Sequence, residues 1–250
     1  MHHLVAFRES VDPGNAFVNI NAVADQALFT SGDDVRVPEE MANIIGAAAL
    51  INDASGARAR IESPSLRSLV NIDVEPIVLA AVFGSPPEAL FHPRSPVPLV
   101  GDEAINFAAL SDPAAGVEHV GLVWLADGPQ QPVDGTVYTV RATSTVAQVA
   151  GAWTVGPLVF SQTLPAGRYQ IAGWVARSTD AIAARLVFPG GRWRPGVPCI
   201  NAIGDRVLRE QRYGGLGVFG EFDHLLPPQV EVLGGVAAAQ VHLFDLIKVG

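Results

Sequence analysis

The chain repeats part of its own sequence at a spacing of 127 residues, about half of its 250-residue length. Residues 38–67 align without a gap to residues 165–194, and nine of the 30 positions are identical. The identical pairs are Pro38/Pro165, Ile44/Ile171, Gly46/Gly173, Ala49/Ala176, Asp53/Asp180, Ala54/Ala181, Ala57/Ala184, Arg58/Arg185 and Arg67/Arg194. An internal repeat of this size predicts two structural units of one fold within the chain.

Weaker matches follow in the same order along both halves. They are "AVAD" (22–25) with "TVAQ" (145–148), "VFG" (82–84 and 218–220), and "HVGLVWL" (119–125) with "QVHLFDL" (240–246). Matches in one order with drifting offsets are typical of duplication followed by loop changes, although two similar strands in an alanine-rich chain are the alternative. The polar, Gly- and Pro-rich "ADGPQQPVDG" (126–135) indicates the seam between the halves. We therefore expect domains over 1–128 and 136–250, joined by a linker over 129–135.

Strand signals dominate both halves. Runs such as "GTVYTVRATST", "RYQIAGWVARS" and "HVGLVWLAD" are apolar or alternating and end at Gly, Pro, Asp or Ser. The alanines of "MANIIGAAALI" would also suit a helix, but its repeat partner "YQIAGWVAR" favours a strand. Each half offers roughly seven or eight short strands, enough for a two-sheet sandwich. The predicted fold is all-β, with two tandem jelly-roll β-sandwiches, and an immunoglobulin-like sandwich is the alternative.

Three pairs of repeated residues invite a physical interpretation: Gly46/Gly173, Asp53/Asp180 and Arg58/Arg185. The glycines fall within strands and predict close packing or a bulge. The aspartates stand where a strand gives way to a turn, which they are expected to cap. The arginines follow small residues, so each guanidinium is expected to reach a carboxylate or carbonyl groups at a domain edge. All three pairs indicate structural roles more than a site used twice.

The charge of the chain, together with its lack of targeting signals, limits the kinds of function that we expect. The formal net charge is −9 and Lys248 is the only lysine. The chain therefore lacks the positive charge that binding to the phosphates of a nucleic acid needs. The first residues lack the apolar core and cleavage site of a signal peptide, and no apolar run is long enough to span a membrane. We expect a soluble chain made in the cytosol. Cys199 is the only cysteine and is expected to be a buried structural thiol.

The sequence predicts no catalytic residue, no cofactor and no metal site. None of the six histidines forms an H-x-H pair: His2, His3, His92, His119, His224 and His242. We expect the first two to be terminal and mobile, and the others to be surface or hydrogen-bonded core residues. Nucleophile elbows and phosphate-binding loops are missing, and "YGGLGVFGEFD" (213–223) is better explained as a flexible loop. The chain is therefore not expected to be an enzyme.

This organisation resembles the double jelly-roll major capsid proteins of tailless icosahedral bacteriophages. The resemblance covers the whole chain, but it rests on two β-rich halves and their repeat, because no short motif can be carried over. It implies a homotrimer of pseudo-hexagonal outline that tiles an icosahedral shell with neighbouring trimers and penton or vertex proteins. The protein would then be made in the host cytoplasm and end in the virion, with no specific nucleic-acid binding.

Two further features agree with a shell protein. Long Pro-rich segments at 83–103 and 194–217 follow corresponding regions of the halves and are expected to build trimer contacts or outward decoration. A mean hydropathy of +0.29 suits large interfaces. The N-terminal arm, residues 1–17, is expected to lie against an internal membrane or a neighbouring subunit through Leu4, Val5, Phe7 and Arg8. A plain first strand with a frayed end is the alternative.

Two other functions compete with the shell protein. A carbohydrate-binding or adhesion module would use tryptophan rings as stacking platforms. Trp124 and Trp174 lie in apolar strand runs and are expected in the core, whereas Trp193 in "GGRWRPG" is the best exposed candidate, with Trp153 as the fourth tryptophan. The third hypothesis is an enzyme of bicupin descent without its metal motif, against which the histidine spacing argues.

Overall fold

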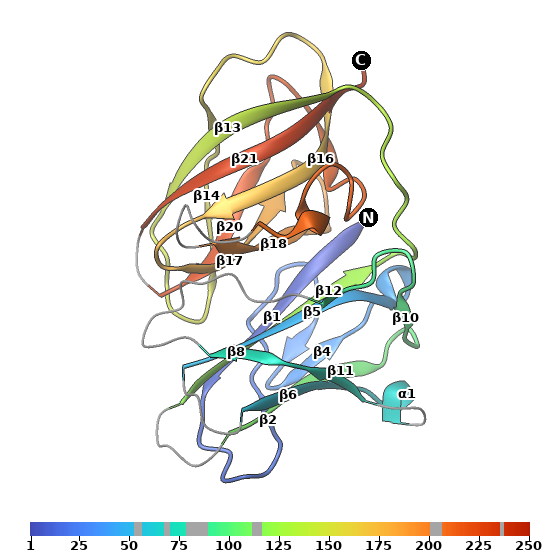
Figure 1. Cartoon of the computed structure of the whole chain (residues 1–250), viewed down its shortest axis with the longest axis vertical. Helices are drawn as coiled ribbons and strands as arrows, with labels where there is room; N and C mark the ends of the chain where they lie inside the picture. The colour runs from blue at the N-terminus through green and yellow to red at the C-terminus, as the bar shows by residue number, and fades with distance from the viewer. Residues whose placement is uncertain (53–56, 68–70, 79–89, 112–116, 201–206, 236–237) are drawn as a thin grey trace. The chain divides into compact units, whose positions relative to one another are not determined.

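The computed structural model describes residues 1–52, 57–67, 71–78, 90–111, 117–200, 207–235 and 238–250. The chain is all-β with several sheets, consistent with the predicted β-sandwich class (Figure 1). It divides into two compact units. The C-terminal unit contains Met1–Leu4 together with Pro129–Gly250, and the N-terminal unit contains the described residues between Val5 and Gly128. No helix in the described ranges is long and apolar enough to cross a membrane.

Short strands make up most of the N-terminal half. They are β1 (His2–Ser10), β2 (Val18–Ile20), β3 (Thr30–Ser31), β4 (Asp34–Arg36), β5 (Asn43–Ile51), β6 (Arg58–Glu62), β7 (Ile72–Val74), β8 (Pro76–Val78), β9 (Leu90–Phe91), β10 (Val97–Pro98), β11 (Ala104–Leu110) and β12 (Glu118–Ala126). The helical pieces are η1 (Glu39–Met41) and α1 (Pro64–Arg67).

The C-terminal half contains longer strands. They are β13 (Val137–Val146), β14 (Trp153–Gly156), β15 (Val159–Phe160), β16 (Arg168–Arg177), β17 (Ala181–Val187), β18 (Gly196–Ile200), β19 (Gly220–Asp223), β20 (Gln229–Gly234) and β21 (Ala238–Lys248), with the short helix η2 (Arg209–Gln211). Figure 1 shows β13, β21 and β16 side by side, in agreement with their hydrogen-bonded pairing.

Burial follows from the sequence pattern of each strand. In β13 the residues from Val140 to Val146 alternate between buried and exposed, as expected for a strand with one face on the core. In β5 and β16 most residues are buried, and both strands are central in their sheets. The alanine-rich stretch in β5 is thus a strand, as its repeat partner predicted, because sheet pairing overrides the helix propensity of alanine.

The two units arrange their strands in the same order. One sheet of the N-terminal unit runs β1-β12-β5-β10, and the C-terminal unit contains the order β13-β21-β16-β19. The second order in the N-terminal unit is β2-β11-β6-β7, and its counterpart is β14-β20-β17-β18. Each central strand also has a parallel partner, with Ala49 opposite Pro76 and Ala176 opposite Cys199.

A register irregularity occurs at the same place in both units. The pairing of β5 with β12 shifts between Ile44 and Gly46, and the pairing of β16 with β21 shifts between Ile171 and Gly173. Both glycines therefore adjoin a bulge, as the sequence predicted. At Gly173 the approach is close, because an added Cβ would lie 2.9 Å from the backbone nitrogen of Tyr213.

Each unit has a tryptophan buried in its core. Trp124 is fully buried and meets Phe91 edge to face, with ring centroids 4.8 Å apart. Trp174 is fully buried and stacks on Phe244 at 5.6 Å. The prediction that these two tryptophans pack in the core is confirmed.

Candidate functional site

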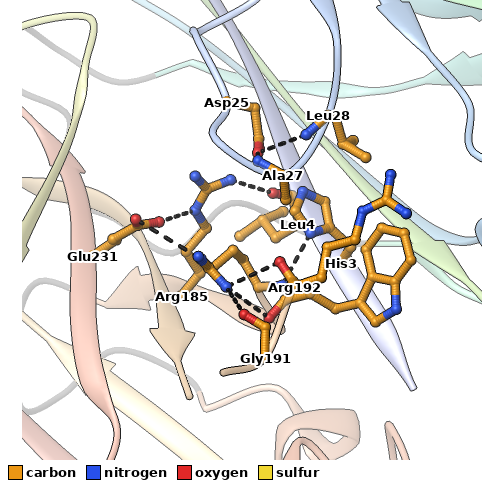
Figure 2. Close-up of polar contacts among 11 residues, drawn as sticks. His3, Leu4, Asp25, Ala27, Leu28, Arg185, Gly191, Arg192 and Glu231 are labelled. Carbon is orange, nitrogen blue, oxygen red and sulfur yellow. Dashed lines mark hydrogen bonds and ion pairs between the residues drawn. The ribbon is translucent and has the colours of Figure 1, made fainter. Parts of the chain in front are cut away.

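A buried charged cluster in the C-terminal unit centres on Arg185 of β17 (Figure 2). The strand register places Arg185 directly opposite Glu231 of β20. The Arg185 Nε donates to Glu231 Oε2 at 2.5 Å, and the two side chains are 0% and 5% exposed. The Nε of Arg194 lies 3.9 Å from the other carboxylate oxygen of Glu231. Because the strand register places Arg185 opposite Glu231, the two side chains neutralise each other, and neither charge is buried alone.

The same arginine binds the first strand of the chain. Its Nη1 donates to the carbonyl of Leu4 at 3.1 Å, and its guanidinium carbon lies 4.1 Å from the ring centroid of Trp153. Figure 2 shows Arg185 between Glu231 and Leu4. The sequence predicted that this guanidinium would reach a carboxylate or a carbonyl group, and it binds one of each in the interior of its unit.

Residues Met1–Leu4 are held by several further contacts. The backbone nitrogen of Leu4 donates to the Arg194 carbonyl at 2.9 Å, and the Arg194 nitrogen donates to His3 Nδ1 at 3.0 Å. The His2 ring meets Phe219 edge to face at 4.8 Å. Gly196 makes room for Leu4, since an added Cβ would lie 2.6 Å from Leu4 Cδ2. These contacts make a docking site for the N-terminal strand.

The docking site corrects one expectation for the N-terminal arm. His2 and His3 were expected to be mobile, but both are fully buried in strand β1. Leu4 and Phe7 are 0% exposed, and Phe7 packs against Phe107 of its own unit. That the arm lies against a membrane or a neighbouring subunit stays a prediction.

The other repeated polar residues have separate environments. Arg58, the repeat partner of Arg185, lies over the ring of Phe17, at 5.8 Å from its centroid. Asp180 accepts a hydrogen bond from the Thr179 hydroxyl at 2.7 Å. Its repeat partner Asp53 lies outside the described residues. Arg58 and Arg185 thus make different contacts.

A second buried polar site was missed by sequence reasoning. Asp245 of β21 is 0% exposed and accepts from Arg212 at both carboxylate oxygens, at 2.7 and 2.8 Å. It also accepts from the Tyr213 backbone nitrogen at 3.1 Å. The hydrogen bond to Asp245 raises the pKa of Arg212. The Asp245 carboxylate therefore fixes the segment after η2 beside the bulge at Gly173. The only sign of this site in the sequence was an aspartate within an apolar strand run.

Buried hydrogen bonds also engage His242. Trp174 Nε1 donates to His242 Nδ1 at 3.2 Å, so Nε2 carries the proton and donates to Ser144 Oγ at 2.9 Å. Ser144 in turn donates to Gln240 at 2.8 Å. Burial lowers the pKa of His242 to about 3 and that of His119 to about 4. Both histidines are thus neutral core residues, as the sequence predicted.

The remaining candidates are arranged as follows. In the part of the chain that the structure describes, no three His, Cys, Asp or Glu side chains gather to hold a metal ion. Cys199 is buried, as predicted, and burial raises its pKa. Trp193 is only half-exposed, with the Arg192 guanidinium carbon 4.4 Å from its ring centroid and His3 edge-on at 5.9 Å. Its ring is therefore a poor open stacking platform.

Neither a protein-family model nor a curated protein sequence matches the chain. The chemistry of the site itself must therefore guide its interpretation. Its charged groups are neutralised by one another and by backbone carbonyls in the interior of the unit. Such an arrangement fixes the N-terminal strand to its unit.

Proposed function

We propose that the chain is a self-assembling shell subunit, a major capsid protein in which each unit is a jelly roll. The observation that carries the proposal is the strand order, which is the same in both units. We number from 1 to 8, in chain order, the eight strands of each unit that appear in the two strand orders given above. These are β1, β2, β5, β6, β7, β10, β11 and β12 in the N-terminal unit, and β13, β14, β16, β17, β18, β19, β20 and β21 in the C-terminal unit. In both units the strand orders are then 1-8-3-6 and 2-7-4-5. This connectivity, in which strand 1 lies beside strand 8 and strand 2 lies beside strand 7, is typical of jelly rolls, a fold of viral capsid and lectin domains.

The repeat supports the duplication of one jelly roll. The sequence offset that aligns the two halves also aligns the register shift beside Gly46 with that beside Gly173. It likewise aligns Ala49 with Ala176, each opposite a parallel strand. A strand resemblance that arose by composition alone would have no reason to place a bulge and a parallel partner at equivalent positions.

Exposed apolar side chains support assembly. Leu225 and Leu226, in the turn between β19 and β20, are 79% and 58% exposed. Val155 and Val159, on β14 and β15, are 51% and 61% exposed. Surface apolar groups of this kind mark interfaces when they are contiguous. Homotrimers that associate further would cover such surfaces.

Light scattering after size exclusion, followed by electron microscopy, tests the proposal. We expect a stable trimer, or closed shells of uniform size. The variant Leu225→Asp should shift the distribution toward smaller species, while Glu221→Gln on the neighbouring strand should leave it unchanged. A monomer at every concentration, without shells under varied salt and pH, would overturn the proposal.

A further inference from the structure

The C-terminal unit contains a cavity of about 490 Å³ at one end of the face shared by β13, β16 and β21. The strand register explains its walls, because Tyr138 lies opposite Leu246 and Tyr169 lies opposite Lys248. Alternation along each strand then points Val140 and these side chains to one face. The volume is within the range of pockets that hold small molecules.

The segment 162–165 forms the remaining wall. Leu164 and Pro165 contribute apolar surface, and Gln162 and Thr163 contribute polar groups. The Tyr169 hydroxyl donates to the Pro165 carbonyl at 2.7 Å, which ties this wall to the sheet. The cavity thus combines an apolar interior with a few polar groups, the usual character of a ligand pocket.

Among the described residues that line this cavity, Lys248 is the only one with a cationic side chain, and it is the only lysine in the chain. Its stem lies along Gly167, where an added Cβ would be 2.6 Å from Lys248 Cε. No carboxylate of the described residues lies within ion-pair distance of its ammonium group. A single positive charge beside an apolar cavity is complementary to a molecule with an apolar body and one negative charge.

We propose that this cavity binds a small amphipathic carboxylate, with the aliphatic or aromatic body between Tyr138, Leu164 and Leu246 and the carboxylate at Lys248. The apolar body contributes most of the affinity by leaving water. The ammonium group contributes selectivity for an anion over a neutral analogue. The site is independent of the shell proposal, since every described residue that lines it belongs to one unit of one chain.

The unique lysine permits a direct test on the whole protein. Reductive methylation with a ¹³C label keeps the charge of Lys248 and gives it the only ε-amine signal. We expect octanoate to move this signal saturably. Calorimetry should give octanoate an affinity about threefold to fivefold higher than octanamide, the range for a solvent-exposed ion pair.

Variants separate the charge from the cavity. Lys248→Gln should lower octanoate affinity to that of octanamide and leave octanamide binding unchanged. Arg168→Gln is the matched control, because it removes a neighbouring positive charge that does not line the cavity. Tyr138→Ala should weaken both probes. The proposal is overturned if octanoate gives no saturable shift at millimolar concentration, or if Lys248→Gln binds octanoate like the wild type. Neither result bears on shell assembly, which microscopy decides separately.

Discussion

At the scale of single residues, burial decides what each charged group does. Arg185 and Glu231 neutralise each other with almost no exposed surface, whereas Arg168 and Glu221 form a similar pair with side chains 65% and 38% exposed. Water screens the exposed pair, so it contributes little to stability. In the buried pair, the loss of either partner would leave a charge in a medium that cannot solvate it.

Replacement of Arg185 by methionine should therefore destabilise the C-terminal unit strongly. We expect the free energy of unfolding to fall by about 3–5 kcal/mol, because the Glu231 carboxylate stays buried without its main partner. Arg168→Gln, which breaks the exposed pair, should cost no more than about 1 kcal/mol. Urea unfolding of both variants measures the difference. Equal losses in the two variants would contradict a structural role for the buried pair.

The buried histidine of the C-terminal unit predicts a pH dependence. His242 has a pKa of about 3 in the folded chain, and a histidine in an unfolded chain titrates near 6.5. Between these values the unfolded state binds a proton that the folded state does not, so stability falls as the pH drops below about 6.5.

The slope from this one residue is about 1.4 kcal/mol per pH unit, which amounts to about 2 kcal/mol between pH 6.5 and pH 5. His242→Gln removes the titrating group, so the loss on acidification should shrink by that amount, whatever the variant's stability at pH 7. Urea titrations at pH 7 and pH 5 give the comparison. Parallel pH profiles for wild type and variant would show that His242 is accessible to protons in the folded chain.

At the scale of elements, the periodic strands were predictable and the short ones were not. The alternation in β13 and the apolar runs of β12, β16, β17, β20 and β21 match the strands observed. Strands of two residues, such as β3, β9, β10 and β15, are too short to show a period. For β5 the internal repeat gave the correct assignment where its alanines alone would have favoured a helix.

The bulge beside Gly173 has no room for an added side-chain atom. An added Cβ would approach the Tyr213 nitrogen to 2.9 Å and the Arg212 Cα to 3.0 Å, both within the segment that Asp245 anchors. Gly173→Ala should therefore displace this segment and cost about 1–3 kcal/mol. Gly235→Ala is the control, because nothing lies within 4 Å of its added Cβ.

Thermal unfolding of both glycine variants tests this prediction. Hydrogen exchange should in addition show faster exchange at Tyr213 in Gly173→Ala, since its backbone N–H loses the Asp245 carboxylate. If Gly173→Ala is as stable as Gly235→Ala, the close approach at the bulge does not constrain the fold.

At the scale of the whole molecule, the chain crosses from one unit to the other near the start of its first half and again at the end of that half. The passage at Gly128 and Pro129 falls where Gly, Pro and polar residues already indicated a seam. The passage between Leu4 and Val5 lies inside strand β1 and had no signal in the sequence. The partners of the first four residues, such as Arg185 and Arg194, lie more than half the chain away, and no local pattern encodes such distant pairing.

Deletion of residues 1–4 should accordingly destabilise the C-terminal unit, although the rest of that unit lies far from them in sequence. The Leu4 carbonyl would no longer accept from Arg185, and Phe219 would lose its ring contact with His2. We expect hydrogen exchange to accelerate in β17 and β18 and the C-terminal unit to unfold at lower urea concentration. Leu4→Ala keeps the backbone contacts and removes only the buried side chain, so its loss should be smaller, about 2–5 kcal/mol for a fully buried leucine. Exchange that accelerates only between residues 5 and 128 would show that the first four residues do not stabilise the C-terminal unit.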